Sequence, residues 1–346
     1  MLWRTMTGAA NELLKATARS FYLTLRVLPE PVRAQIGLAY LLARTTDTVA
    51  DTEIVPVAER LAALRRLRER ITGQSAAALD FGELAQWQGA PAEKRLLEKA
   101  EDSMAALEAL TAPDRTLVRE VLVTITSGQE LDVKRFAGAS ESRVAALETA
   151  ADLDDYTYRV AGCVGEFWTK ICRARLFPGA GLDEPQLQAD GIRFGKGLQL
   201  VNILRDLPAD LKIGRCYLPR QTLAGAGLAP EEILRPDREE AFLRVFRAQL
   251  DLAEGHLAAG WRYTNALPFS QFRVRLACAW PLLVGVKTLR RLRAAGIADL
   301  QRRVKVPRSE VYGVMASTTL ACGVPFWWRR LYLPDAKAVA SGGKLA

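Results

Sequence analysis

Apolar residues recur at spacings of three and four along almost the whole chain, which is the period of an amphipathic α-helix. Two such stripes are Leu61, Leu64, Leu67 and Ile71, and Leu96, Leu97, Met104 and Leu107. The apolar–polar alternation of a half-buried strand is almost absent. The pattern therefore predicts an all-α fold of about ten helices.

The interruptions in this helical pattern are short, at residues 72–82, 177–185, 223–236 and 265–270. None has the composition of a long Gly/Ser linker. A chain of 346 residues that is 49% hydrophobic can bury a full core. We therefore expect one all-α domain over residues 1–333, followed by a flexible C-terminal tail over residues 334–346.

The rare residue types exclude several chemistries. His256 is the single histidine, so a two-histidine metal motif is impossible and a histidine-based triad would have to use it. It lies outside every motif described below, and we interpret it as structural. The five cysteines have no CxxC spacing, which argues against a zinc ribbon or a disulfide framework and fits a reducing cytoplasm. No signal peptide is recognisable at residues 1–10, so we expect a cytoplasmic protein.

The formal net charge is +9, from 48 Lys and Arg against 39 Asp and Glu. A basic chain suggests nucleic acid as a partner, but the arginines are spread over helical patterns such as residues 60–71. No RNA-binding aromatic motif or finger accompanies them, so we do not expect a nucleic-acid partner. Most of the basic residues are explained as solvated positions on helix faces. Some of them could bind an anionic substrate or an anionic membrane surface.

The longest uncharged stretch covers residues 311–328 and contains glycines and a proline. A spanning helix needs about 20 mainly apolar residues, so a buried or interfacial helix is the favoured interpretation. Aromatic residues beside arginines at 325–332 suit a bilayer interface. A peripheral membrane surface is thus an open partner, and a non-catalytic membrane-associated scaffold is the rival function.

A first aspartate cluster lies in residues 39–51. Asp47 and Asp51 are four residues apart, and Arg44 and Tyr40 fall on the same helical face. Two carboxylates one turn apart repel each other unless a cation is present. Hard oxygen ligands at this spacing suit Mg²⁺, which also binds substrate phosphates. A solvated polar face is the alternative, but the apolar run before the cluster indicates a largely buried helix.

A second cluster lies in residues 197–219, where Gln199, Asn202, Asp206 and Asp210 form a polar stripe on an otherwise apolar helix. A buried stripe of this kind is costly unless it is satisfied, and a metal–diphosphate complex would satisfy it. Pro208 tends to kink a helix, which makes the position of Asp210 less certain than that of Asp206. Two further residues can contact phosphate, namely Arg205 and Arg215.

Two aspartate faces, each with an arginine, predict a single reaction. In it, Mg²⁺ ions bridge the two faces and remove diphosphate from an allylic substrate, acting as Lewis acids. Apolar helices around the site would exclude the water that quenches a carbocation.

Four motifs, in order, resemble those of the squalene/phytoene synthase family, the head-to-head trans-prenyl transferases. They are residues 18–21 (Ala-Arg-Ser-Phe), 44–51 (Arg-Thr-Thr-Asp-Thr-Val-Ala-Asp), 156–165 (Tyr-Thr-Tyr-Arg-Val-Ala-Gly-Cys-Val-Gly) and 199–219. The resemblance covers roughly residues 16–320. The chain departs from the family pattern at Ala50 and Ala209, where members often carry acidic residues, and each face consequently has fewer carboxylates.

The resemblance implies an isoprenoid-synthase-like helical bundle around a central apolar cavity, which we expect to be monomeric. It implies Tyr156 as the proton relay and four metal-binding aspartates, Asp47, Asp51, Asp206 and Asp210. The implied diphosphate-binding residues are Arg19, Ser20, Arg44, Gln199, Asn202, Arg205 and Arg215. Within the third motif, Cys163 is interpreted as a packing residue.

Two further segments favour the squalene-synthase branch. Residues 276–281 and 304–311 resemble segments that phytoene synthases usually lack, the second of them near where NADPH binds. The expected reaction joins two farnesyl diphosphates to presqualene diphosphate and reduces it to squalene. The expected NADPH-binding residues are Asn202, Lys305 and Arg308, with no GxGxxG fingerprint. The loop at 217–219 is the form common in bacterial and phytoene-type members. Phytoene or dehydrosqualene synthase, and a presqualene diphosphate or hydroxysqualene synthase working without NADPH, stay open.

Overall fold

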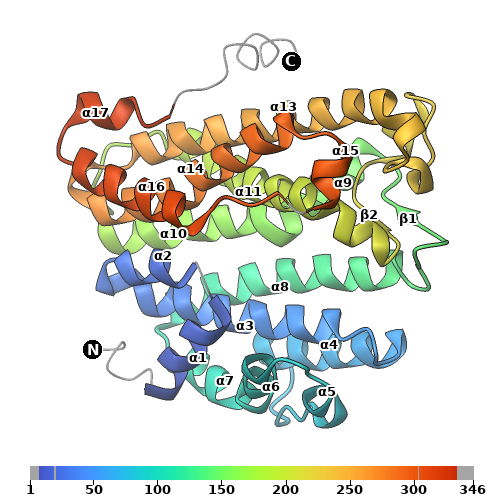
Figure 1. Ribbon diagram of the computed structural model, residues 1–346. Coiled ribbons are helices and arrows are strands. Elements are labelled where there is room, and N and C mark those ends of the chain that lie inside the picture. The colour runs from blue at the N-terminus through green and yellow to red at the C-terminus, as the bar shows by residue number, and fades with distance from the viewer. Residues whose placement is uncertain (1–7, 19–20, 303, 333–346) are drawn as a thin grey trace. The chain divides into compact units, whose positions relative to one another are not determined.

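The computed structural model describes residues 8–18, 21–302 and 304–332, with side chains from residue 11 onward. Helices make up most of it and strands very little (Figure 1), which confirms the predicted all-α class. The chain divides into two compact units, Met1–Ala137 with Phe167–Ala180, and Gly138–Glu166 with Gly181–Ala346. The single domain and the tail at 334–346 stay predictions, and the tail lies outside the described residues.

The first unit holds eight helices and the end of a ninth within the described part of the chain. They are α1 (Gly8–Ala18), α2 (Phe21–Val27), α3 (Glu30–Asp51), α4 (Val57–Thr72), α5 (Gly82–Gln86), α6 (Pro91–Glu98), α7 (Ala100–Glu108), α8 (Ala112–Arg135) and the last part of α10 (Cys163–Leu176).

The core of the first unit lies where α3 and α4 both pack against α8. The side chains of Leu42, Leu64 and Leu122 are fully buried there. Both apolar stripes predicted from the sequence face this interior, and seven of their eight members are buried. Helix α4 is capped at its C-terminus by Gly73, whose φ of +79° is a left-handed conformation that favours glycine.

The second unit begins with β1 (Ala145–Ala146), α9 (Ala150–Thr157), the π-helix η2 (Tyr158–Gly162) and the start of α10. It continues with α11 (Glu184–Lys212), β2 (Arg215–Cys216), α12 (Arg220–Ala224), η3 (Pro230–Glu232), η4 (Pro236–Arg238), α13 (Glu239–Ala266), η5 (Phe269–Gln271), α14 (Phe272–Ala294), α15 (Ile297–Gln301), α16 (Arg308–Ala321) and α17 (Pro325–Arg329).

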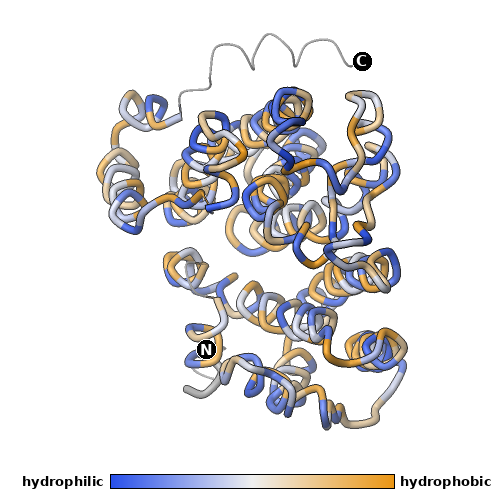
Figure 2. Tube along the Cα trace, turned by 45° about the vertical axis from the view of Figure 1, so that its right-hand side comes forward, coloured by the Kyte–Doolittle hydropathy of each residue, from blue (hydrophilic) through white to orange (hydrophobic). Residues whose placement is uncertain are grey.

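Helix α11 is the centre of the second unit and packs against α13, α14 and η2. It begins at the N-cap Asp183, whose Oδ1 accepts a hydrogen bond from the Gln186 amide at 3.0 Å. Helix α9 begins with a capping box, in which Thr149 and Asp152 each bond the other's backbone amide, at 3.1 and 2.9 Å. In both units the helices carry hydrophobic and hydrophilic residues around each turn, as amphipathic helices do (Figure 2).

The predicted interruptions agree with the ends of the main helices. Helix α4 ends at Thr72, α10 at Leu176 and α13 at Ala266, each at a predicted break. The described residues contain more helices than the predicted ten, because short helices of five to nine residues occupy several connections. Among the helices of the described ranges, none is long and apolar enough to span a bilayer.

Candidate functional site

The first aspartate face lies on the C-terminal half of α3. Arg44 forms ion pairs with Asp47 one turn further on and with Glu93 of α6. The Tyr40 hydroxyl donates to the backbone carbonyl of Thr17 at 3.1 Å. The Asp47 side chain is 39% exposed and Asp51 is exposed, so the expectation of a buried carboxylate face is wrong in degree. Asp51 therefore keeps more contact with water than Asp47 does.

The remaining sides of this stretch of α3 are buried and include three threonines, Thr45, Thr46 and Thr48. The hydroxyl of Thr45 donates to the carbonyl of Leu41 at 2.9 Å, and that of Thr46 donates to Ala43 at 2.7 Å. Such bonds to the preceding turn satisfy a hydroxyl without a partner from another helix. They explain how α3 buries Thr45 and Thr46, whereas the buried hydroxyl of Thr48 has no hydrogen-bond partner.

The carboxylates of α3 are electrostatically unfavourable in the absence of a cation. Burial, followed by the negative charge of Asp51, raises the pKa of Asp47 to about 7, while Arg44 opposes the rise. The pKa of Arg44 is itself raised by Asp47 and Glu93, although burial acts against this. A second cation beside Asp47 and Asp51 would relieve the repulsion between them.

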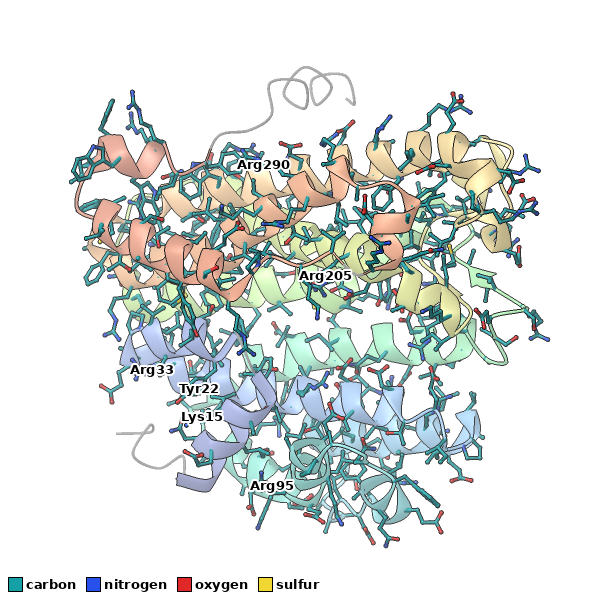
Figure 3. All side chains as sticks on the ribbon, in the orientation of Figure 1. Lys15, Tyr22, Arg33, Arg95, Arg205 and Arg290 are labelled. Atoms are coloured by element: carbon teal, nitrogen blue, oxygen red, sulfur yellow. The ribbon has the colours of Figure 1, made fainter. Side chains whose placement is uncertain are left out.

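The second aspartate face lies on α11, which continues through Pro208 to Lys212. Pro208 does not end the helix, so Asp206 and Asp210 belong to one continuous helix. Arg205, labelled in Figure 3, bonds its neighbour Asp206, with Nε 3.1 Å from Oδ1. Their side chains are 31% and 28% exposed, so this stripe is also half-buried. Gln199 is half-buried and Asn202 is exposed.

Arg215 follows α11 in a connection that two local features hold in place. Gly214 has a φ of +78°, and a Cβ there would lie 2.3 Å from the amide nitrogen of Ser140, so only glycine fits. Strand β2 then pairs in parallel with β1, with Arg215 opposite Ala145. Arg215 is half-buried and thus fixed at the end of the aspartate helix.

Tyr156 is buried at the end of α9 and stacks on Tyr217, with ring centroids 4.7 Å apart. The chain then passes through the π-helix η2, a feature frequent at functional sites. Glycines on both sides allow this motif to lie in close contact with α11. A Cβ on Gly165 would lie 1.9 Å from the carbonyl oxygen of Gly191, and one on Gly195 would lie 2.1 Å from that of Ala161.

A polar cluster around this motif was not predicted. The Tyr158 hydroxyl donates to Glu166 at 2.9 Å, and burial together with this bond raises the pKa of Tyr158 to about 12. Lys196 of α11 lies 2.7 Å from the carboxylate of Asp154 and near the Tyr158 ring. The pair of Lys196 and Asp154 joins two helices that are 42 residues apart in sequence, so spacing alone could not reveal it. Cys163 is buried in the same motif, as expected of a packing residue.

The remaining residues singled out in the sequence lie away from the two aspartate faces in sequence. Lys305 and Arg308 are exposed at the start of α16, where they suit a phosphate group. Arg19 and Ser20 lie outside the described residues. His256 is half-buried against Gly197 of α11, and burial with the nearby Arg193 and Lys196 lowers its pKa to about 4. This placement fits the structural role predicted for it.

Magnesium suits the donor set of both faces. Each face offers two carboxylates one turn apart, and Mg²⁺ usually takes one or two carboxylates with waters and substrate phosphates completing its shell. Within the described ranges no three acidic, histidine or cysteine side chains gather as a metal site. The faces therefore fit a metal that arrives with a phosphate ligand better than one held by protein alone.

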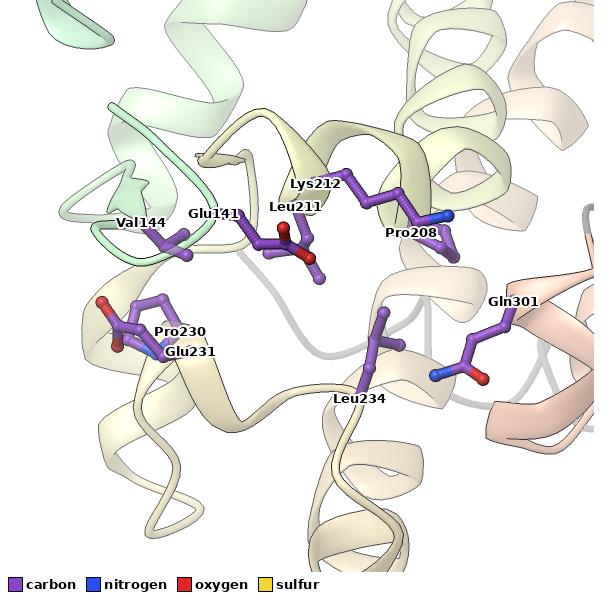
Figure 4. Close-up of a pocket in the computed structure, with 9 residues that line it drawn as sticks. All are labelled: Glu141, Val144, Pro208, Leu211, Lys212, Pro230, Glu231, Leu234 and Gln301. Atoms are coloured by element: carbon purple, nitrogen blue, oxygen red, sulfur yellow. The ribbon is translucent and has the colours of Figure 1, made fainter. Parts of the chain in front are cut away.

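The second unit also contains a pocket of about 430 Å³ beyond the end of α11 (Figure 4). Its charged and amide groups come from Glu141, Lys212, Glu231 and Gln301. None of the predicted site residues lines it, and it takes Pro208 and Leu211 of α11 instead of the aspartates. The pocket is therefore lined by residues other than those of the candidate site, and its mixed charges indicate no class of ligand.

Known proteins of one family are similar to the chain in sequence and in fold. The model of the squalene/phytoene synthase family matches residues 14–310. A presqualene diphosphate synthase of Sinorhizobium fredii is 30% identical over 259 residues, which cover 75% of this chain and 79% of that protein. A squalene synthase of Schizosaccharomyces pombe is 27% identical over 285 residues, which cover 80% of this chain and 58% of that protein. Among solved structures, TcSQS bound to the ligand E5700 shares the fold, with a TM-score of 0.75, 21% identity and coverage of 96% and 93%.

Proposed function

The chain belongs to the squalene/phytoene synthase family of prenyltransferases, and from this premise we propose that it joins two farnesyl diphosphates head to head to give presqualene diphosphate. The observation that carries the proposal is the pair of matching carboxylate faces, on α3 and α11, each with an arginine beside it. This step is common to the presqualene diphosphate synthase and squalene synthase relatives. It is thus better supported than the later reduction.

Asp47, Asp51, Asp206 and Asp210 would hold Mg²⁺ in this reaction. When bound with substrate, the metal neutralises the diphosphate and makes it a better leaving group. Arg44, Arg205 and Arg215 bind diphosphate oxygens, for which a planar guanidinium is well suited. Gln199 and Asn202 add neutral hydrogen bonds from the same face of α11.

The chemistry of the condensation balances without an added reductant. One farnesyl diphosphate loses diphosphate to give an allylic cation, and the double bond of the second attacks it to form a carbon–carbon bond. Loss of one proton then closes the cyclopropane ring. Tyr156 carries that proton in our proposal, and its burial against Tyr217 supports a role in which water is excluded.

Reduction of presqualene diphosphate to squalene is the second candidate activity. The exposed cations Lys305 and Arg308, in the segment that resembles squalene synthases, favour it, since two cations suit a phosphate of NADPH. Asn202 is the third residue proposed to bind this cofactor. A cytoplasmic location and a monomer stay predictions.

Incubation with farnesyl diphosphate and Mg²⁺, with and without NADPH, tests both activities. We expect presqualene diphosphate in both reactions, and squalene only with NADPH if the second activity is present. Hydroxysqualene regardless of NADPH would support the branch that works without the cofactor. Phytoene from geranylgeranyl diphosphate, with no product from farnesyl diphosphate, would overturn the substrate assignment. A scaffold would give no product from either substrate.

A further inference from the structure

The last two described helices expose an uncharged surface. Between residues 311 and 328 the chain has no charged side chain, although charged residues make up 25% of the whole. Tyr312 and Leu320 of α16 are 60% and 76% exposed. Phe326 and Trp327 of α17 are 59% and 58% exposed. Large apolar side chains exposed together mark an interaction surface more often than chance exposure.

The exposed aromatics of α17 are held outward by buried neighbours. Trp328 is buried, stacks on Trp261 at 5.5 Å and donates from Nε1 to Asn265 at 2.9 Å. Tyr332 stacks on the same Trp261 ring at 5.6 Å. Figure 1 shows α17 directly after α16, at one end of the second unit. The exposure of Phe326 and Trp327 is thus a property of a packed element.

The short helix η5, directly before α14, adds Phe269 to this surface through a contact with Arg275. The Arg275 guanidinium lies 5.0 Å from the centroid of the Trp328 ring and 5.5 Å from that of Phe269. Phe269 is 54% exposed. We call Phe269, Tyr312, Leu320, Phe326 and Trp327, with Arg329 and Arg330, the α16–α17 surface.

The charge of this part of the chain is strongly one-sided. Residues 255–332 contain thirteen lysines and arginines but two acidic residues, Asp299 and Glu310. Glu310 is already paired with Lys287 and Arg291. Because the net charge of the whole chain is +9, the rest of the chain is slightly acidic. Part of this charge is neutralised from outside the segment, since Arg262 pairs with Asp190 and Arg293 pairs with Asp251 and Glu254. The cations that lie beside Phe326 and Trp327 are Arg329 and Arg330, which are both exposed.

We propose that the α16–α17 surface docks on the surface of an anionic lipid bilayer. Phe326 and Trp327 enter the interface between headgroups and acyl chains, where aromatic rings are favoured. Arg329 and Arg330 bind anionic headgroups, and Arg330 also lies over the Phe326 ring at 4.1 Å. A second copy of the chain fits less well, because a symmetric contact would bring the same basic groups together.

Flotation of the purified full chain with lipid vesicles tests the proposal. We expect it to bind vesicles of phosphatidylcholine mixed with phosphatidylglycerol at low salt, and to bind pure phosphatidylcholine much less. Added salt should weaken the binding. The double variants Phe326→Ala/Trp327→Ala and Arg329→Glu/Arg330→Glu should each lower partitioning by more than about tenfold.

Matched controls come from the first unit. Trp87 is 55% exposed there, and Arg65 and Arg66 are adjacent exposed arginines. The variants Trp87→Ala and Arg65→Glu/Arg66→Glu should bind as the wild type does, and circular dichroism should show all four variants folded.

Three results would overturn the proposal. They are no binding to anionic vesicles, an equal loss in the control variants, and a wild-type dimer that Phe326→Ala/Trp327→Ala converts to a monomer. The assay measures no turnover, so it succeeds or fails independently of the proposed reaction.

Discussion

The two aspartate helices carry the same pattern of side chains on differently built scaffolds. Both α3 and α11 place two carboxylates four residues apart with an arginine nearby. On α3 the arginine is shared with Glu93 of another helix, whereas on α11 Arg205 pairs with its sequence neighbour Asp206. One charge pattern can thus be held by a partner helix or by its own helix.

The packing of these helices differs more than their charge. A Cβ on Gly37 of α3 would make an ordinary contact of 3.4 Å with a Leu14 methyl group. A Cβ on Gly195 of α11 would overlap the backbone of Ala161 at 2.1 Å. Helix α3 therefore has room for a side chain, and α11 relies on a close backbone approach that no side-chain movement can relieve.

The largest expected effect comes from removing one carboxylate from either face. Asp47→Asn and Asp206→Asn should each lower kcat for presqualene diphosphate formation by about 10²- to 10³-fold, because each removes charge stabilisation of the leaving group. If the two faces serve one reaction, the double variant should lose much less than the product of the single losses. Losses that multiply fully would show that the faces act independently.

A smaller loss is expected from the tyrosines that accompany the two faces. Tyr156→Phe should lower kcat by about 10²-fold if its hydroxyl moves the proton. Tyr40→Phe should change kcat only a few-fold, since the Tyr40 hydroxyl is already used on the Thr17 carbonyl. The ratio of the two effects is measured by steady-state kinetics. Equal losses of kcat in the two variants would contradict the proposal that Tyr156 carries the proton.

The packing contrast predicts opposite changes in stability. Gly195→Ala should lower the free energy of unfolding by about 1–3 kcal/mol or more, because it overpacks α11. Gly37→Ala should leave it unchanged or raise it by up to about 1 kcal/mol, because alanine favours a helix over glycine. Urea denaturation of both variants measures the difference. A stable Gly195→Ala protein would contradict the close approach.

The smallest effect concerns the partner of Arg44. Glu93→Gln removes one of the two carboxylates that hold this guanidinium, which leaves it freer for diphosphate. The KM for farnesyl diphosphate should fall by about two- to fivefold, the range expected for a partly exposed ion pair. Glu98→Gln is the control on the same helix, since Glu98 pairs with Lys94 instead. A KM unchanged in both variants would argue against competition for Arg44.

Much of the fold could be predicted because helical periodicity is a local property. The positions of Leu64, Leu67 and Ile71 follow from the sequence, and all three are buried. The break at residues 265–270 follows equally from its proline and polar residues. The short helices in the connections could not be predicted, because five-residue segments carry too little periodicity.

The candidate carboxylates could be placed on one helical face each from the sequence, but the residues that contact them could not be predicted. Asp47 and Asp206 stand out by spacing, whereas Glu93 and the close contact at Gly195 depend on helices that meet only in the folded chain. The degree of exposure was also unpredictable, since the apolar run before Asp47 buries the other side of α3. Likewise, the uncharged stretch at 311–328 fitted a buried or an interfacial helix until the exposure of Leu320 was known.

We propose above all that the carboxylates of α3 and α11 hold the same Mg²⁺–diphosphate substrate. Equilibrium binding of a farnesyl diphosphate analogue with an unreactive thiodiphosphate group, titrated with and without Mg²⁺, tests it without turnover. We predict that Mg²⁺ tightens binding to the wild-type protein, and that Asp47→Asn and Asp206→Asn each lose most of this tightening while staying folded. Full Mg²⁺-dependent tightening in either variant would contradict the account.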